Sequence, residues 1–442
     1  MNLVGVVICN FNKREYVINC IKSVLESSFQ SMDIYVVDNA STDDSVEFIK
    51  KEYGNKVTLI VNKQNLGGSG GFNTGLKKAL ENNYKYLMCV DNDIVMEKNN
   101  IENLYKFMET NLDVGMVGSK ICRMNKPELL QELGAQINFE KFNVKPHFQD
   151  FLDDNQIPEI MYCDYVPACS LMVRTSAVRE VGILPEANFI YWDDMEWGYC
   201  FNLKGYKVAA YSRAIVYHAM GTTSGETYFS TYYFWRNRIR FFMKYTPKDK
   251  LDNMKRVILE NFFQTIYGCL YKEKFNQIKI MMYAFDDAIH GKLGKAGQHK
   301  ILAKDILINR INELLLDKEK ILIDFNGDYK ALADIIKQLP EGKKVNIYYN
   351  GDCRSLQKLY INCKVINENK ADNWDVYLKM CEHVSNIEDI SLKMIYIDRY
   401  NNLLVNEKDI NHFKNYKYNF NLFYHCYVTL LDESIRSMRC EN

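Results

Sequence analysis

Tyr86-Leu87-Met88-Cys89-Val90-Asp91-Asn92-Asp93-Ile94 is a short apolar run that stops at two carboxylates flanking an amide. We expect its apolar part to form a buried strand that delivers Asp91 and Asp93 to its carboxyl end, where an open α/β sheet binds ligands. Carboxylate oxygens are ligands for hard divalent cations. The stretch suggests a metal-bridged phosphate site, but on its own it is better explained as a strand followed by an acidic turn.

Short apolar runs alternate with amphipathic segments of helical length over the first 120 residues. The apolar runs cover 3–9, 33–38, 57–61, 85–90 and 114–118. This alternation is typical of a mostly parallel sheet wrapped by helices, so it predicts an α/β fold.

The composition indicates a globular chain without a general affinity for polyanions. Its 442 residues are 47% hydrophobic, and 56 basic residues balance 56 acidic ones, so we expect two or three domains and no nucleic-acid partner. The 13 cysteines include no C-x-x-C pair. No apolar run reaches the roughly 20 residues that span a bilayer, and the first strand, 3–9, lacks the features of a signal peptide. These observations predict a cytoplasmic protein with reduced thiols.

Polar residues follow the first two strands. The first strand runs into Asn10-Phe11-Asn12, and the second ends at Asp38. At a carboxyl strand end, Asp38 can accept a hydrogen bond from a base or a ribose. Alternatively it only caps its own loop, and the spacing does not separate these two interpretations.

A glycine-rich segment follows the third strand. Asn65-Leu66-Gly67-Gly68-Ser69-Gly70-Gly71-Phe72-Asn73-Thr74-Gly75 holds five glycines in nine positions, before a helix that we expect from Leu76. Such glycines let backbone amides approach a phosphate or a sugar. The segment is neither a P-loop nor a G-x-G-x-x-G fingerprint after the first strand. A flexible linker is the other interpretation, but the segment lies between a strand and a helix of one domain.

Three carboxylates framed by two tryptophans open a predicted helix that continues to Leu203. The stretch is Trp192-Asp193-Asp194-Met195-Glu196-Trp197. Aromatic walls stack on sugars, and a carboxylate in such a pocket can act as a general base. Acidic residues also complement the dipole of a helix in its first turn, which would explain one or two of the three.

His218 ends a predicted strand over 214–217 and precedes a Gly/Ser loop, 219–225. A lone histidine is more often structural than a ligand. At a strand terminus, however, it is a candidate third metal ligand.

An aromatic and basic segment begins the region 227–318, which looks helical. Its run Arg236-Asn237-Arg238 suits diphosphate binding or contact with a membrane surface that carries a lipid-linked substrate. For most of these residues an ordinary helix with an aromatic core face is the simpler interpretation.

The remaining chain completes the predicted division. We expect an insertion or lid over 120–163, and further strands at 321–325, 345–349, 374–378 and 393–397. The predicted domains are a catalytic α/β domain, 1–226, a helical extension, 227–318, and a small C-terminal α/β domain of unknown role, 319–442.

An ordered set of motifs runs through roughly residues 1 to 245: Asn10-Phe11-Asn12, Val36-Val37-Asp38-Asn39, Asn65 to Asn73, Asp91-Asn92-Asp93, Trp192-Asp193-Asp194-Met195-Glu196 and His218. The set resembles the family-two, nucleotide-sugar-dependent glycosyltransferases of GT-A fold. Within that family the glycine segment and the Trp-Asp-Asp helix are most similar to the bacterial galactofuranosyltransferases, which use UDP-galactofuranose.

The resemblance implies roles for individual residues. Asp91, Asp93 and His218 would hold Mn²⁺ or Mg²⁺, and Asp194 would be the catalytic base. Acceptor contacts would come from Trp192, Asp193, Glu196 and Trp197. The implied donor-binding residues are Asn10, Phe11, Asn12, Asp38, Asn65, Gly67, Gly68, Gly70, Gly71, Asn73, Asn92, Arg236 and Arg238.

The chain departs from the family pattern in three respects. Asn92 replaces the middle carboxylate of the more usual triple-Asp form, and Pro167-Ala168 stands where polymerising members carry an aromatic pair. Because the first predicted strand begins at residue 3, we also expect the chain to lack the N-terminal β domain of those polymerases. We therefore expect an enzyme that adds one sugar rather than a processive polymerase.

The expected activity is an inverting, metal-dependent transfer of a sugar, galactofuranose first, from a UDP-sugar to a glycan or lipid-linked acceptor in cell-surface polysaccharide synthesis. We also expect the protein to contact the inner membrane surface. The alternatives are a same-fold transferase that uses dTDP-rhamnose, UDP-glucose or UDP-galactose, and a non-catalytic glycan-assembly scaffold. The oligomeric state, monomer or homo-oligomer, stays open.

Overall fold

The computed structural model describes residues 2–154, 156–219, 225–306, 309–366, 374–391 and 393–440. The chain forms two compact units. The first comprises Met1–Met254, Ile280–Leu302 and Ser434–Asn442, and the second Lys255–Lys279 and Ala303–Glu433. The predicted helical extension is thus shared between both units, and the three-domain division stays a prediction.

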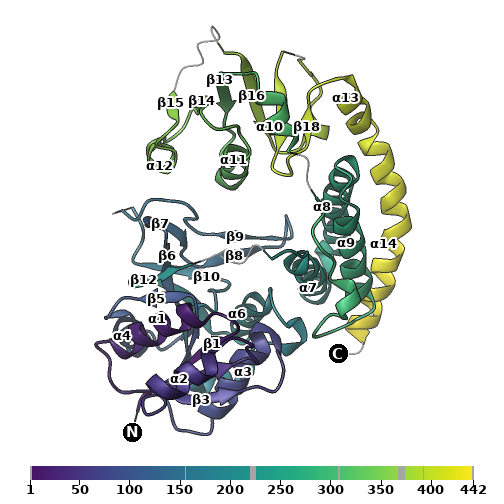
Figure 1. The fold of residues 1–442 in the computed structure, drawn as a ribbon. Coiled ribbons are helices and arrows are strands. Elements are labelled where there is room, and N and C mark those ends of the chain that lie inside the picture. The colour runs from purple at the N-terminus through teal and green to yellow at the C-terminus, as the bar shows by residue number, and fades with distance from the viewer. Residues whose placement is uncertain are drawn as a thin grey trace. The chain divides into compact units, whose positions relative to one another are not determined.

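The first unit is built on a ten-stranded mixed sheet (Figure 1), with strand order β10-β12-β6-β11-β4-β1-β2-β3 and with β5 and β7 attached to β12 and β6. All five apolar runs predicted near the N-terminus are strands: β1 Val4–Asn10, β2 Met32–Asp38, β3 Thr58–Val61, β4 Tyr86–Asp91 and β6 Val114–Arg123. β1 is parallel to both β2 and β4. The predicted α/β class is confirmed, and the carboxyl ends of these strands share one edge.

Helices cover both faces of this sheet because apolar side chains alternate between the two faces along its strands. On β1, Val4, Val6 and Ile8 pack in one apolar cluster, whereas Val7 and Cys9 pack in another. The first cluster takes residues of α1 Arg14–Leu25, α2 Ser45–Tyr53 and α4 Asn100–Thr110. The second takes residues of α3 Gly67–Ala79, α5 Thr175–Val181 and α6 Asp193–Leu203. The predicted end of α6 at Leu203 is confirmed.

The glycine-rich segment is a helix and not a loop before one, because α3 begins at Gly67. A Cβ on Gly71 would lie 2.4 Å from Cys9 Sγ, and one on Gly75 would lie 2.3 Å from Val7 Cγ1. These two glycines therefore allow α3 to lie against β1. Close helix–sheet packing outweighs the low helix propensity of glycine.

The sequence indicated an insertion or lid without regular structure over 120–163. The structure instead has mostly short strands in this region. They are β7 Lys126–Glu132, β8 Ala135–Asn138, β9 Asn143–Pro146 and β10 Ile160–Cys163. β8 and β9 form a separate two-stranded sheet, and β7 pairs antiparallel with β6. Strands this short show too little hydrophobic alternation to be recognised.

Three strands complete the frame of the functional edge. β11 Ser170–Arg174 is antiparallel to β4 and β6. β12 Lys207–His218 is parallel to β6, and its last residues pair with β5 Ile94–Met96. β12 ends at His218, as predicted, whereas most of the Gly/Ser loop after it, 220–224, lies outside the described residues.

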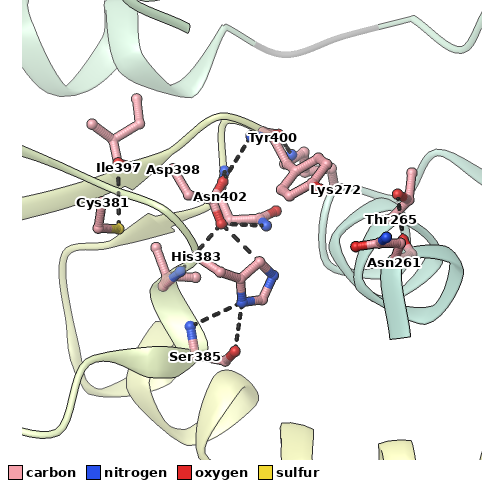
Figure 2. Close-up of polar contacts among 11 residues, drawn as sticks. Asn261, Thr265, Lys272, Cys381, His383, Ser385, Ile397, Asp398, Tyr400 and Asn402 are labelled. Carbon is pink, nitrogen blue, oxygen red and sulfur yellow. Dashed lines mark hydrogen bonds and ion pairs between the residues drawn. The ribbon is translucent and has the colours of Figure 1, made fainter. Parts of the chain in front are cut away.

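The second unit holds a separate six-stranded sheet with order β15-β14-β13-β16-β17-β18. It contains the later predicted strands as β13 Lys320–Asp324, β14 Lys344–Tyr348, β16 Val376–Cys381 and β17 Ile395–Asp398, with β15 Lys364–Ile366 and β18 Leu403–Leu404 at its edges. Figure 2 shows a buried polar cluster in this unit, where Asp398 accepts hydrogen bonds from the backbone nitrogens of Tyr400 and Asn402. This carboxylate organises the turn after β17.

The helices of the later chain are α7 Phe229–Tyr245, α8 Leu251–Tyr271, α9 Phe275–Ile289, α10 Arg310–Leu315, α11 Tyr329–Ile336, α12 Arg354–Leu359, α13 Glu407–Lys414 and α14 Tyr416–Cys440. Across the described residues, none of the helices has both the length and the apolar character needed to cross a membrane.

Candidate functional site

Asp91, Asp93 and His218 converge at the carboxyl edge of the first sheet. Each offers a ligand atom, and these atoms all lie within 4.8 Å of one another. Asp91 ends β4, whereas His218 pairs across the β5–β12 ladder with Ile94, the residue after Asp93. The antiparallel pairing of β5 with β12 thus brings together ligands that are far apart in the sequence.

The two carboxyl groups of this cluster differ in the direction in which their pKa is shifted. Burial and the Asp93 charge raise the pKa of Asp91 to about 7. Burial also acts to raise the pKa of Asp93, but its bonds to His218 and Lys13 outweigh burial and lower it to about 2. His218 Nε2 lies 3.2 Å from Asp93 Oδ1, and Lys13 Nζ lies 2.7 Å from Oδ2. A cation bound between the carboxylates would favour the ionised form of both.

The other ring nitrogen of His218 is held by the protein. Its Nδ1 lies 2.9 Å from Gln131 Oε1. Because an amide oxygen only accepts, Nδ1 donates, and the remaining nitrogen is the one that faces Asp93. Two carboxylates with an imidazole oriented in this way form a donor set that fits a divalent cation.

The predicted nucleotide residues form one buried network across three strand ends. Asn10 Nδ2 donates to Asp38 Oδ2 at 3.0 Å, and Asn92 Nδ2 donates to Asn10 Oδ1 at 2.7 Å. The backbone nitrogen of Ser41 donates to Asp38 Oδ1. Phe11 beside them is 40% exposed. Asn12 Oδ1 accepts from the backbone nitrogen of Thr42.

The first turn of α3 lies beside the carboxylates of α6. A Cβ on Gly68 would be 3.8 Å from Asp193 Oδ2, and one on Gly67 would clash with the carbonyl oxygen of Phe189. Asn65 Oδ1 accepts from the backbone nitrogen of Gly67. Of the other predicted positions, Gly70 packs against Leu66, and Asn73 donates to the carbonyl oxygen of Leu184.

Asp193 and Asp194 begin α6 as buried or half-buried carboxyl groups. Burial and the charge of Asp194 raise the pKa of Asp193 to about 8. Burial also raises the pKa of Asp194, although backbone bonds oppose the rise. Asp194 accepts from the backbone nitrogens of Ala168 at 3.3 Å and Met195 at 2.9 Å. A carboxylate with a raised pKa is suited to proton transfer.

The loop before α6 is strained and is clamped by α7. Phe189, Tyr191 and Trp192 have φ angles of 65°, 62° and 67°, a conformation that side-chain-bearing residues adopt rarely. Asn237 Nδ2 approaches the carbonyl oxygen of Tyr191 at 2.8 Å, and also those of two neighbouring loop residues. Arg236, which is 1% exposed, donates to further carbonyl oxygens of this region.

The remaining predicted residues have protein partners. Arg238 donates to the carbonyl oxygen of Phe142. Glu196 is turned toward α7, where it accepts from Lys244 and Tyr245, and from Asn188 in the loop. Trp192 and Trp197 are each 1% exposed. These contacts do not test the roles suggested for these residues in substrate binding, which stay predictions.

Several residues at the site escaped the sequence analysis. Lys13 directly follows the quoted Asn10-Phe11-Asn12, and Asn237 stood inside the run Arg236-Asn237-Arg238 without a role of its own. Gln131 and Glu132 fell in the segment that looked irregular. Glu132 is 8% exposed, and its Oε2 has no hydrogen-bond partner among the described residues. In the sequence, the two adjacent polar residues after Leu129-Leu130 could have marked this strand as part of the site.

Comparisons with known proteins match part of the chain. Residues 5–174 match the model of glycosyl transferase family 2. An uncharacterized glycosyltransferase of Haemophilus influenzae is 23% identical over 198 residues, which are 44% of this chain and 58% of that protein. The UDP-Glc:alpha-D-GlcNAc-diphosphoundecaprenol beta-1,3-glucosyltransferase WfaP of Escherichia coli is 29% identical over 110 residues, 25% and 43% of the two chains.

The galactofuranosyltransferase GlfT2 of Mycobacterium tuberculosis is 24% identical over 253 residues, which are 52% of this chain and 38% of that protein. The chain therefore spans less than two thirds of the length of each of these three relatives.

Proposed function

We propose that the protein transfers a sugar from a nucleotide donor to an acceptor hydroxyl with inversion, since residues 5–174 match the model of glycosyl transferase family 2. One observation carries this proposal. The backbone nitrogen of Asp91 donates to the carbonyl oxygen of Cys169 at 3.0 Å, and the backbone nitrogen of the adjacent residue, Ala168, donates to Asp194 at 3.3 Å. Groups suited to a diphosphate and to a proton transfer thus share one site.

Asp91, Asp93 and His218 would hold the divalent cation, Mn²⁺ or Mg²⁺, which when bound supplies positive charge to the diphosphate of the donor. In this proposal the edge formed by Asn10, Asp38 and Asn92 holds the nucleoside. The first turn of α3 lies along the donor beside Asp193. Arg236 contributes by fixing the loop that precedes α6.

Asp194 takes the proton from the acceptor hydroxyl as that oxygen attacks the anomeric carbon from the face opposite the leaving diphosphate. Its backbone donors at Ala168 and Met195 favour the ionised form. Asp193, with a pKa raised to about 8, is mostly protonated near neutral pH. Asp194 is therefore the better acceptor of a proton, and Asp193 is suited to donate a hydrogen bond to a substrate.

The donor that we propose first is UDP-galactofuranose, since a galactofuranosyltransferase matches half of the chain. UDP-glucose is the main alternative, because the Escherichia coli relative is named for that donor and for a lipid-diphosphate acceptor. dTDP-rhamnose and UDP-galactose follow. The acceptor is a glycan or a lipid-linked glycan, which would bring the protein to the cytoplasmic membrane surface.

A donor panel tests the proposal. Release of nucleoside diphosphate is measured for these four donors with candidate acceptors, with Mn²⁺ and with EDTA. We expect one donor to dominate and EDTA to abolish its turnover. A purified, folded protein that turns over none of them would contradict the proposal and favour a non-catalytic scaffold.

A further inference from the structure

We propose that Glu132 is a substrate-contacting residue, whose free carboxyl oxygen Oε2 binds a hydroxyl of the transferred sugar. This inference rests on the proposed function, because it concerns the same site. It assigns a sugar contact to a strand, β7, from which the sequence predicted none.

The strand of Glu132 lies beside the candidate metal ligands. Its neighbour Gln131 contacts His218, and β7 pairs with β6, which in turn pairs with β12 up to His218. Burial raises the pKa of the Cys169 thiol, and the charges of Asp91, Glu132, Asp93 and Asp194 add to that rise, which agrees with this position.

A bulge in β7 links Glu132 to the candidate metal ligands Asp91, Asp93 and His218. Pairing with β6 passes from Leu130, opposite Cys122, to Glu132, opposite Ile121, and skips Gln131. In a regular strand Gln131 and Glu132 would point to opposite faces, whereas a bulge can turn consecutive residues toward one site. The Gln131 side chain contacts His218 and also interacts with the Glu132 carboxyl group.

The geometry of the reaction identifies the ligand. The transferred sugar must lie between the leaving diphosphate and the attacking hydroxyl. Glu132 is linked to His218 through Gln131, and burial together with the charge of Asp194 raises its pKa, as expected for a position near the proposed base. A group that lies between the candidate metal ligands and the proposed base would face the transferred sugar rather than the nucleoside.

The hydrogen-bonding state of Glu132 agrees with an open ligand position. Its side chain is 8% exposed, yet Oε2 lacks a partner among the described residues. A buried carboxyl oxygen without a partner is costly, and a sugar hydroxyl would satisfy it. Burial and the Asp194 charge raise the pKa of Glu132 to about 8, so this group can also donate.

The test compares wild type, E132Q and E132A on the best donor and on its monodeoxy analogues, using kcat/KM. In wild type we expect one analogue to lose on the order of a hundred-fold, because a site built around a hydroxyl rejects a substrate without it. E132A should be slow on the parent donor but lose less than about threefold further on that analogue, since the contact is already absent. E132Q, which retains hydrogen-bonding atoms, should fall between them.

E128Q is the matched control, because Glu128 lies on the same strand with an exposed side chain. It should behave as wild type toward every analogue. If wild type and both Glu132 variants discriminate equally among all analogues, Glu132 has a purely structural role and the inference is wrong. If E132A does not fold, the same comparison with E132Q decides. If wild type transfers sugar from no nucleotide donor, the proposed function fails and the inference falls with it.

Discussion

The side-chain nitrogen of Asn237 lies 2.8 Å from the carbonyl oxygen of Tyr191. Asn237 belongs to α7, whereas Tyr191 is one of three residues with positive φ just before the carboxylates of α6. Strained backbone persists when its surroundings hold it in place. The position of Asp193 and Asp194 therefore depends on a helix that provides neither of them.

Replacing Asn237 by alanine should lower kcat while the protein stays folded. The variant loses the clamp on the strained loop, and displacement of a catalytic group by about 1 Å can cost on the order of a hundred-fold in rate. Asn411→Ala, on an exposed face of α13, is the matched control. Steady-state kinetics and thermal unfolding are measured on both. An Asn237 variant with wild-type kcat would show that α7 does not position the carboxylates.

Asp194→Asn and Asp193→Asn should differ. Loss of a general base typically costs about 10² to 10⁴ in rate, so Asp194→Asn should lose turnover by that range with nearly unchanged affinity for UDP in the presence of Mn²⁺. Asp193→Asn keeps a group that donates hydrogen bonds and should lose much less. Turnover and calorimetric binding are the readouts, and the reverse order would exchange the two roles.

The stability of the protein in EDTA should fall as the pH rises from about 4 to about 8. Asp193 and Glu132 have pKa values near 8 in the folded chain, compared with ordinary values of 3.8 and 4.5. The folded state thus binds more protons in this range, so raising the pH favours unfolding. Urea midpoints across the range measure the effect. Asp193→Asn should flatten the dependence, and an equal slope in that variant would refute the raised pKa.

Much of the fold could be predicted from the sequence because the signals are local. Apolar runs such as Tyr86–Val90 mark buried strands, and the polar residues that follow them reach one sheet edge. Gln131 and Glu132 could not be placed, since their shared orientation depends on a bulge against β6. The helical state of Gly67 to Gly75 depends on contact with Cys9 and Val7, which propensity does not encode.

The residue types of the candidate site could be predicted from the sequence, but the contacts between those residues could not. Asp91, Asp93 and His218 could be named as candidate ligands, yet the contact of Lys13 with Asp93 appears only in three dimensions. Arg236 was expected to suit a diphosphate because it is basic. In the fold its guanidinium is 1% exposed and donates to backbone carbonyl oxygens, a role that charge alone does not predict.

Calorimetric titration of UDP into wild type and Asp93→Ala, each with and without Mn²⁺, tests whether Asp93 helps to hold a cation that the donor needs for binding. Asp317→Ala, an exposed carboxylate of the second unit, is the control. We expect Mn²⁺-dependent UDP binding in wild type and the control, and none in Asp93→Ala, because that variant loses one of the three residues that would hold the cation. Mn²⁺-dependent binding of equal affinity in Asp93→Ala would contradict the account.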